Sequence, residues 1–250
     1  MFERIGEHVY IKAPEGYSDR PTIGYIKGDA FSLLFEAGAS EHHVQDIKRD
    51  LEEMNLPLPS LVAVSHWHWD HSFGLKEWKV PTIAGKETNK VLKRLSSYKW
   101  DEDSIKERIQ KKEEIIFCHE MMKREYGDTN SIKVVPASIE FQKELKIDLG
   151  GITVTLLHIS GPHSRDSIVL YVPSEKVLFL GDSHGKDLYT FPWHFDIKEE
   201  DQFMREVEKI PYDLMEKEEY VERLQALDFS IAIPGHSCCM KREELFSLLK

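Results

Sequence analysis

Residues 66–71 read His-Trp-His-Trp-Asp-His and constrain this chain more than any other stretch. The imidazoles and the carboxylate stand too close together for ordinary packing to satisfy them all. They are ligand types that suit zinc and its neighbours in the first transition row. The apolar segment 61–65 follows a proline-rich turn at 57–59 and predicts a short buried strand. The sequence therefore predicts a metal site just past the carboxyl end of a strand, where open α/β sheets place their sites.

The spacing inside this run divides the ligands into two sets. In an extended segment, the side chains of His66 and His68 point to the same side and suit one ion. Asp70 and His71 follow where the chain turns into a helix-like segment, so they are better placed for a second ion.

Length, charge and cysteine content limit the classes of protein to consider. At 250 residues, the chain is predicted to form one domain over 1–250, with a helical insertion at about 86–131. The formal net charge of −11 disfavours nucleic acid as a partner. No segment resembles a signal peptide or reaches membrane-spanning length, and the 3 cysteines form no disulfide framework. These features predict a cytoplasmic protein that acts on a small molecule and has no membrane partner. They leave the oligomeric state open.

The apolar pattern predicts an α/β fold. Strands are predicted at 8–12, 22–27, 31–35, 61–65, 81–85, 133–136, 145–149, 152–157, 167–172, 176–180 and 231–233. Helices are predicted at 41–55, 199–208, 216–226 and near 241–249, and the charge-dense insertion predicts two or three more. Ser40 is expected to cap the first helix, and Gly-rich pairs at 28–29 and 150–151 are expected to form hairpin turns.

Three further candidate ligands each follow a predicted strand. His163 follows strand 152–157, Asp182 follows the buried strand 176–180 through Gly181, and His236 follows strand 231–233 through Pro-Gly. Ligands that converge at one edge of the sheets suit two ions roughly 3.5–4 Å apart.

The run at 66–71, His163, the Gly-Asp pair at 181–182 and Pro-Gly-His at 234–236 resemble the metallo-β-lactamase superfamily. Their order and spacing match that family over about residues 8–240. The resemblance implies a four-layer αβ/βα sandwich of two mixed sheets with flanking helices. It implies that the first metal ion is held by His66, His68 and His163 and the second by Asp70, His71 and His236. Asp182 would bridge the two ions from one side and a hydroxide from the other.

Three positions depart from the usual pattern of this family. Glu36 stands where the first motif normally has aspartate, so the contacts that support the ligand loop are expected to shift without loss of a ligand. The motif at 161–163 reads Gly-Pro-His, and Arg165 brings a guanidinium near it, although an exposed arginine needs no function. Phe73 takes a place often held by glycine in thioesterases and lactonases of the family, which weakens a direct transfer of either activity.

The resemblance implies a hydrolase with two divalent ions, zinc by ligand type, with iron or manganese as alternatives. Its substrate would be a small-molecule ester, lactone, thioester or phosphodiester, attacked by the metal-bridging hydroxide. Asp70 would steer the proton of the nucleophile, and His184, a second water or a tyrosine would protonate the leaving group. The alternative on the same scaffold is an iron-dependent oxidoreductase similar to persulfide dioxygenases. A non-catalytic metal-binding protein is disfavoured because every ligand position is filled.

The remaining histidines carry other expectations. His158 is expected to be a packed, hydrogen-bonded core histidine. His42 and His43 lie at a helix start and are expected to face solvent. His119 and His194 have no second ligand at metal spacing, so no metal role is expected for either.

Cysteine and aromatic residues near the candidate ligands leave alternatives open. Cys238 and Cys239 are expected to be buried structural thiols rather than metal ligands. The aromatic segment 189–195 either lines a substrate pocket or packs against the core or another subunit. Trp67 and Trp69 flank ligands and are expected to wall the site.

Overall fold

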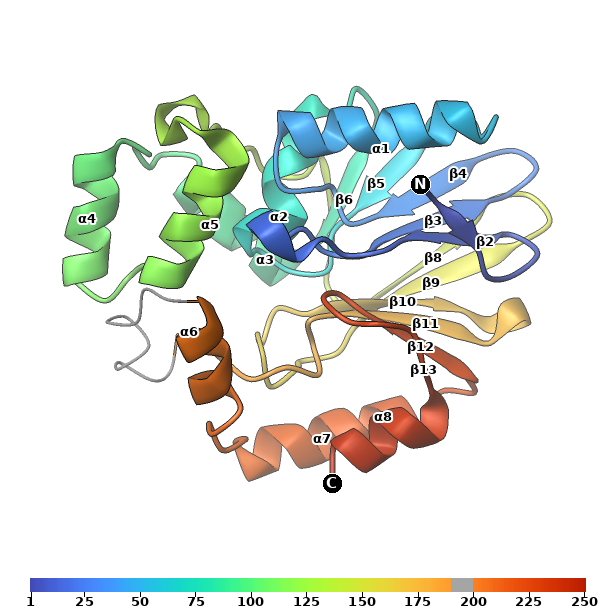
Figure 1. The fold of residues 1–250 in the computed structure, drawn as a ribbon. Helices are drawn as coiled ribbons and strands as arrows, with labels where there is room; N and C mark the ends of the chain where they lie inside the picture. Colours follow the sequence, from blue (N-terminus) through green and yellow to red (C-terminus); the bar gives the residue numbers. More distant parts are fainter. Residues whose placement is uncertain (190–199) are drawn as a thin grey trace.

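Two β-sheets packed face to face form the centre of the molecule, and helices cover the outer face of each sheet (Figure 1). The structure is a computed structural model that describes residues 1–189 and 200–250. In Figure 1, α1 (Glu41–Glu53) lies on the outer side of the first sheet, and α7 (Leu214–Gln225) and α8 (Arg242–Leu248) lie on that of the second. This arrangement confirms the predicted four-layer αβ/βα sandwich.

The first sheet has its strands in sequence order. They are β1 (Glu3–Arg4), β2 (Val9–Lys12), β3 (Ile23–Lys27), β4 (Ser32–Phe35), β5 (Leu61–Ala63), β6 (Thr82–Gly85) and β7 (Ile139–Phe141). Neighbours from β1 to β4 are antiparallel, and those from β4 to β7 are parallel. The parallel strands end at one edge, so the loops after β5 and β6 lie close together there.

The second sheet is built from hairpins and one parallel pair. Its order is β13 (Met240–Lys241), β12 (Ile231–Pro234), β11 (Val177–Gly181), β10 (Ile168–Val172), β9 (Thr153–His158) and β8 (Glu144–Asp148). Among the described strands of this second sheet, only β11 and β12 pair in parallel. The loops after these two strands therefore leave the same edge of the sheet.

Helices connect the strands close to where the sequence predicts them. The remaining ones are α2 (Trp69–Ser72), α3 (Lys86–Leu95), α4 (Glu102–Gln110), α5 (Ile116–Tyr126) and α6 (Glu200–Val207). The Ser40 side chain accepts a hydrogen bond from the backbone N–H of His43, which confirms Ser40 as the cap of α1. Among residues 1–189 and 200–250, no helix has both the length and the apolar character that a membrane span requires.

Alternating strand residues build separate layers of the core. In β4, Leu33 and Phe35 pack between the two sheets, whereas Leu34 packs against the helices on the outer side. The ring centroid of Phe35 lies 5.9 Å from that of Phe179 of the second sheet. Only glycine fits at position 24, because a Cβ atom there would lie 2.5 Å from the Phe179 ring. Burial on both faces explains why these strands read as continuous apolar runs.

The segment between β6 and β7 holds α3, α4 and α5, where the sequence predicts two or three helices. In Figure 1, α4 and α5 lie at one end of the sandwich. The predicted strand at 133–136 is wrong, because this stretch is irregular and the sheet gains Ile139–Phe141 instead. Pro136 lacks a backbone N–H. The backbone N–H of Ala137 donates to the side-chain oxygen of Asn89 (2.7 Å) rather than to a neighbouring strand.

Candidate metal centre

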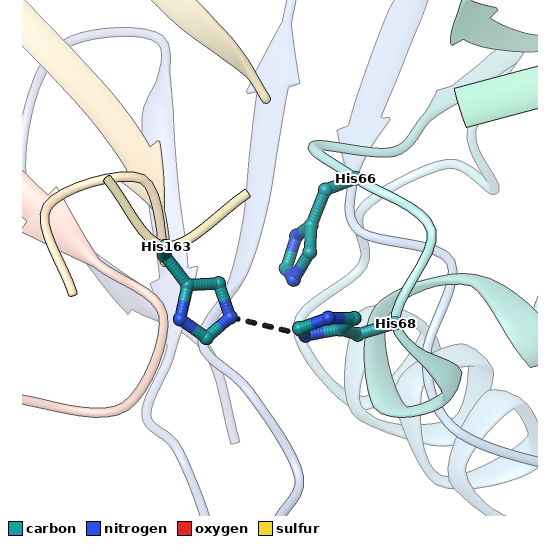
Figure 2. Close-up of side chains that lie close together, drawn as sticks. All are labelled: His66, His68 and His163. Carbon is teal, nitrogen blue, oxygen red and sulfur yellow. Dashed lines mark hydrogen bonds between the residues drawn. The ribbon is translucent and has the colours of Figure 1, made fainter. Parts of the chain in front are cut away.

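The first ligand group contains His66, His68 and His163. His66 and His68 lie in the loop between β5 and α2, and His163 lies in the loop after β9. One nitrogen from each of these buried side chains lies within 4.8 Å of the other two. Figure 2 shows the three rings turned towards one another, with His163 Nε2 3.0 Å from His68 Nδ1. The structure thus brings together the three histidines predicted for the first ion.

Neighbouring groups orient these rings. His163 Nδ1 lies 2.8 Å from the carbonyl oxygen of Lys186, which can only accept a hydrogen bond. Nδ1 therefore carries the proton, and the lone pair of Nε2 is left facing the group. Ser65 Oγ lies 2.8 Å from His66 Nδ1, and His66 Nε2 is buried without a hydrogen-bond partner. A buried nitrogen without a partner at this point fits a metal ligand.

The second ligand group contains Asp70, His71, Asp182 and His236, whose ligand atoms also lie within 4.8 Å of one another. Asp70 Oδ2 lies 3.0 Å from His71 Nε2 and 3.1 Å from His236 Nε2. The two imidazole nitrogens are 3.4 Å apart. Carboxylate oxygens and imidazole nitrogens that face one point suit a divalent ion.

Asp182 lies between the two groups. Its Oδ2 atom is 3.4 Å from both His71 Nε2 and His236 Nε2, and 3.7 Å from His163 Nε2 of the first group. Its Oδ1 atom is buried without a hydrogen-bond partner. Only glycine fits at position 235, because a Cβ atom there would lie 2.0 Å from this Oδ1. Asp182 is therefore placed where one carboxylate can reach both groups.

The electrostatics of the two groups differ. Burial, reinforced by neighbouring imidazoles, lowers the pKa values of His66 and His68 well below the usual value, so these rings are neutral. Burial opposes protonation of His71 as well, but the carboxylates of Asp70, Glu36 and Asp182 raise its pKa well above the usual value. Against burial, the charges of His71 and His236 lower the pKa of Asp70. The first group thus contains two neutral rings, His66 and His68, whereas the second is a cluster of opposite charges.

Glu36 supports the second group despite its departure from the family pattern. It is buried, and its Oε2 atom accepts a hydrogen bond from the backbone N–H of Ser65 (3.1 Å). Its Oε1 atom lies 3.1 Å from His71 Nδ1, which leaves His71 Nε2 for the ligand group. Its φ of +77° is a conformation that non-glycine residues seldom adopt. The longer side chain thus contacts the ligand loop and removes no ligand.

Asp19 is a contact of the second group that the sequence analysis misses. It lies in the loop between β2 and β3, and its Oδ1 atom is 3.4 Å from His236 Nδ1. A carboxylate at the outer nitrogen of a ligand histidine orients the ring and favours its inner nitrogen as a ligand. No spacing rule connects a residue in this loop with a ligand near the carboxyl end of the chain, so the sequence carries no signal for it.

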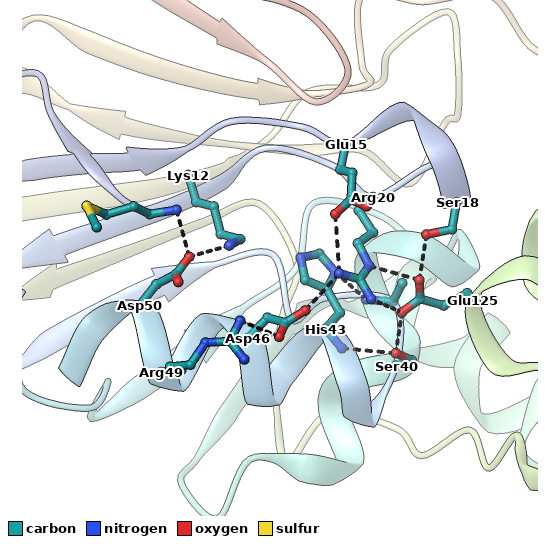
Figure 3. A network of polar contacts seen from close by, with 12 residues as sticks. Lys12, Glu15, Ser18, Arg20, Ser40, His43, Asp46, Arg49, Asp50 and Glu125 are labelled. Carbon is teal, nitrogen blue, oxygen red and sulfur yellow. Dashed lines mark hydrogen bonds and ion pairs between the residues drawn. The ribbon is translucent and has the colours of Figure 1, made fainter. Parts of the chain in front are cut away.

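A partly buried ion-pair network holds the loop that carries Asp19 (Figure 3). Arg20 donates to both carboxylate oxygens of Glu125 in α5, at 2.8 and 3.0 Å, and to Asp46 of α1 at 3.0 Å. Ser18 Oγ donates to the same Glu125 at 2.6 Å, and Ser40 also bonds it. The network fixes this loop against α1 and α5, which explains how an irregular segment places Asp19 at His236.

Two cavities adjoin the ligand groups. The smaller, of about 280 Å³, is lined by residues of both groups, by Phe117 of α5 and by His184. His184 Nδ1 is buried without a partner, and burial lowers its pKa to about 4, so its ring is neutral near pH 7. The larger, of about 680 Å³, is lined by Trp67, Arg165 and Tyr189. Tyr189 of the aromatic segment therefore lines a cavity, and residues 190–195 lie outside the described residues.

Two of the remaining histidine predictions need correction. His42 is exposed, as predicted, but His43 is 1% exposed, and the prediction that it faces solvent is wrong. It lies on the buried face of α1, where its Nδ1 accepts a hydrogen bond from the backbone N–H of Ala39. His158 is hydrogen-bonded to the carbonyl of Arg165 but is only half-buried, so it is not a core residue.

Other residues considered in the sequence do not belong to the ligand groups. Cys238 and Cys239 are exposed, so the prediction of buried thiols is wrong; they lie in the turn between β12 and β13, beyond the core. Arg165 is 81% exposed and pairs with Glu216. His119 lies 3.3 Å from a carboxylate oxygen of Glu102 and belongs to neither ligand group. His194 lies outside the described residues.

Comparisons with known proteins agree with this fold. A search of curated proteins finds no match. A metallo-beta-lactamase from Pontibacter korlensis has a similar structure, with a TM-score of 0.65 and 15% identity over 100% of this chain and 96% of that chain. The DIM-1 metallo-beta-lactamase has a TM-score of 0.59 and 18% identity over 99% of this chain and 94% of that chain. A metallo-beta-lactamase from Hirschia baltica has a TM-score of 0.58 and 17% identity over 100% of this chain and 95% of that chain. The family model of the metallo-beta-lactamase superfamily matches residues 19–236. Because this match covers most of the sequence, the chain belongs to the metallo-beta-lactamase superfamily.

Proposed function

We propose that this protein is a dinuclear metal-dependent hydrolase of a small molecule, with zinc as the metal. The superfamily typically binds divalent metals, and it consists mostly of hydrolases but includes other enzymes. The observation that carries the proposal is the position of Asp182 between two complete ligand groups. A mononuclear iron oxidoreductase would leave the second group without a role, so its full set of donors supports the hydrolase.

Each ligand group would hold one ion, and the chain's own residues would orient the reactants. When bound, the two ions would lower the pKa of a water molecule and stabilise the negative charge that develops on the attacked group. Asp70 faces the centre and is placed to hold the proton of the attacking water. His184 lines the same cavity, and its ring is neutral because its pKa is lowered. A neutral imidazole can donate a hydrogen bond to the leaving group, whereas full proton transfer would need a charged imidazole.

The cavity beside both groups supports an ester, lactone or thioester over a phosphodiester. The apolar part of its lining includes Phe117, Leu188 and Val207. An apolar lining favours the uncharged acyl part of a substrate. The net charge of −11 supports a small molecule rather than nucleic acid as the partner. A cytoplasmic location belongs to the same proposal.

A panel of four substrate classes tests the proposed activity. Protein loaded with zinc would be assayed with aryl esters, lactones, thioesters and phosphodiesters, next to the Asp182→Asn variant and to the exposed control Asp103→Asn. We expect turnover in one of the acyl classes, lost in Asp182→Asn and retained in Asp103→Asn. Zinc-loaded protein that turns over none of the four classes would contradict the hydrolase.

A further inference from the structure

A separate cavity lies between the ligand run and the helices α3 and α4. Its volume is about 240 Å³, and its walls include the rings of Trp67, Trp69, Tyr98 and Trp100. None of the candidate ligands is among the described residues that line it. The space equals that of about eight water molecules. It is large enough for a single aromatic ring with a small polar substituent.

Arg108 of α4 places a buried positive charge at this cavity. Its side chain is packed against two of the aromatic walls, with the guanidinium carbon 4.8 Å from the ring centroid of Trp100 and 5.1 Å from that of Tyr98. Only Nη1 has an acceptor, the carbonyl oxygen of Lys99 at 2.9 Å. Nε and Nη2 are buried without a hydrogen-bond partner, although the residue is only 9% exposed. Two adjacent donors of one guanidinium are therefore unused.

A further unused donor belongs to the same cavity wall. Trp69 Nε1 is buried without a hydrogen-bond partner, and Trp69 lines the cavity together with Arg108. Buried donors without acceptors are uncommon in folded proteins, because each has given up its hydrogen bond to water. Adjacent guanidinium donors match the two oxygens of one carboxylate. These features fit a ligand that carries hydrogen-bond acceptors and a negative charge.

The acidic residues of the cavity favour a small charge on that ligand. Glu113 and Glu114 line it together with Arg94 and Arg108. The Oε1 atom of Glu114 is already engaged, because it accepts from the N–H of Ile115 at 3.0 Å and from the hydroxyl of Tyr189 at 3.2 Å. Burial raises the pKa of Glu114, which weakens its repulsion of an anion. A phosphate dianion would still meet two carboxylates, so a carboxylate is the better match.

We propose that this cavity binds a small aryl carboxylate, with the carboxylate on Arg108 Nε and Nη2 and the ring between the aromatic walls. Phe73 belongs to the same wall, and its ring packs 5.1 Å from that of Trp100. Phe73 thus helps to close the cavity. The binding needs no metal ion, so the inference stands independently of the proposed hydrolase activity.

Calorimetric titration of metal-free, chelator-treated protein with benzoate tests this site. Benzyl alcohol and benzylamine are matched probes that keep the ring and replace the negative charge by no charge or a positive one. The variant Arg108→Met removes the guanidinium, Arg108→Lys keeps a charge without the paired donors, and Trp69→Phe removes one donor but keeps the ring. Arg49→Met on the exposed side of α1 is the control. Circular dichroism and melting curves establish that each variant is folded.

We expect saturable binding of benzoate to the wild type and to Arg49→Met, and weaker or no binding of the two matched probes. Binding should weaken at least about tenfold in Arg108→Met and clearly in Arg108→Lys, because a lysine cannot replace paired donors. Trp69→Phe should show a smaller loss. If Arg108→Met does not fold, Arg108→Lys decides the question. No benzoate binding by the wild type, equal binding of benzyl alcohol, or wild-type affinity in the folded Arg108 variants would overturn the proposal.

Discussion

The two ligand groups of the candidate centre lie side by side but are held in different ways. In the first, burial keeps His66 and His68 neutral, and His163 is oriented by a backbone carbonyl. In the second, opposite charges hold one another, and His236 is still 32% exposed. The comparison indicates that the first group is preformed by packing. The second depends on charged supports from other parts of the chain, so substitutions should affect the two groups unequally.

Loss of the carboxylate shared by both groups should have the largest effect. Asp182→Asn keeps the side-chain volume but removes the charge that lies between His71, His236 and His163. We expect turnover to fall by more than about 100-fold, since substitution of outer partners alone costs about 10- to 100-fold. Steady-state kinetics and metal content would be compared with those of Asp103→Asn. Unchanged turnover would contradict a role for Asp182 in both groups.

Separate removal of one histidine from each group should distinguish them directly. The His163→Ala variant should lose the metal ion bound by the first group, and the His236→Ala variant should lose the ion bound by the second. Because one group offers only imidazole nitrogens and the other also offers carboxylates, the remaining ion should differ between the variants. The visible absorption of cobalt-substituted protein measures this difference. Identical spectra in both variants, or loss of all metal in each, would refute two distinct groups.

Asp19→Asn should affect the second group alone. The substitution removes the charge next to His236 Nδ1 and leaves the side-chain volume unchanged. We expect the affinity for the second ion to fall about tenfold, with that for the first ion unchanged. Competitive titration of metal-free protein with zinc and a chromogenic chelator measures both affinities, with Asp103→Asn as the control. An equal change at both ions would show that Asp19 acts on the whole fold instead.

The last predicted effect is on the stability of the fold and comes from His43, which lies under the loop that follows β4. Burial and the charge of Arg20 lower its folded-state pKa to about 3, against about 6.5 in an unfolded chain. Its contribution to stability is therefore present above pH 6.5 and is lost as the pH falls, because the unfolded state then binds a proton that the folded state does not. Between pH 7 and pH 5 the loss is about 2 kcal/mol.

Urea unfolding of metal-free protein at several pH values measures the His43 contribution. His43→Gln should show a weaker fall in the free energy of unfolding than the wild type between pH 6.5 and pH 4. Parallel curves for the two proteins would show that His43 does not titrate on unfolding.

The candidate ligands could be recognised in the sequence for two different reasons. The run at 66–71 is dense enough to be recognised without any structure. The single ligands His163, Asp182 and His236 needed a second argument, that each follows a strand whose end reaches the same edge. Most strands of the two sheets were predictable because they are short apolar runs that end at clear turn residues.

The failures come from contacts between distant segments. The strand expected at 133–136 has the right residue types, but Asn89 of α3 takes the hydrogen bond of Ala137. The expectation that His43 faces solvent fails because His43 lies four residues before the buried Ile47, on the same face of α1. Asp19 acts through its distance to His236, which only the folded chain defines. Local patterns identify elements and dense motifs, whereas the supports of a site depend on tertiary packing.

The metal content of the purified protein tests the central claim most directly. Elemental analysis would be made on protein prepared without chelator and without added metal, and again after zinc titration. The account predicts about two zinc ions per chain at saturation, one for each ligand group. A single iron ion per chain, or protein that takes up no metal on titration, would contradict it.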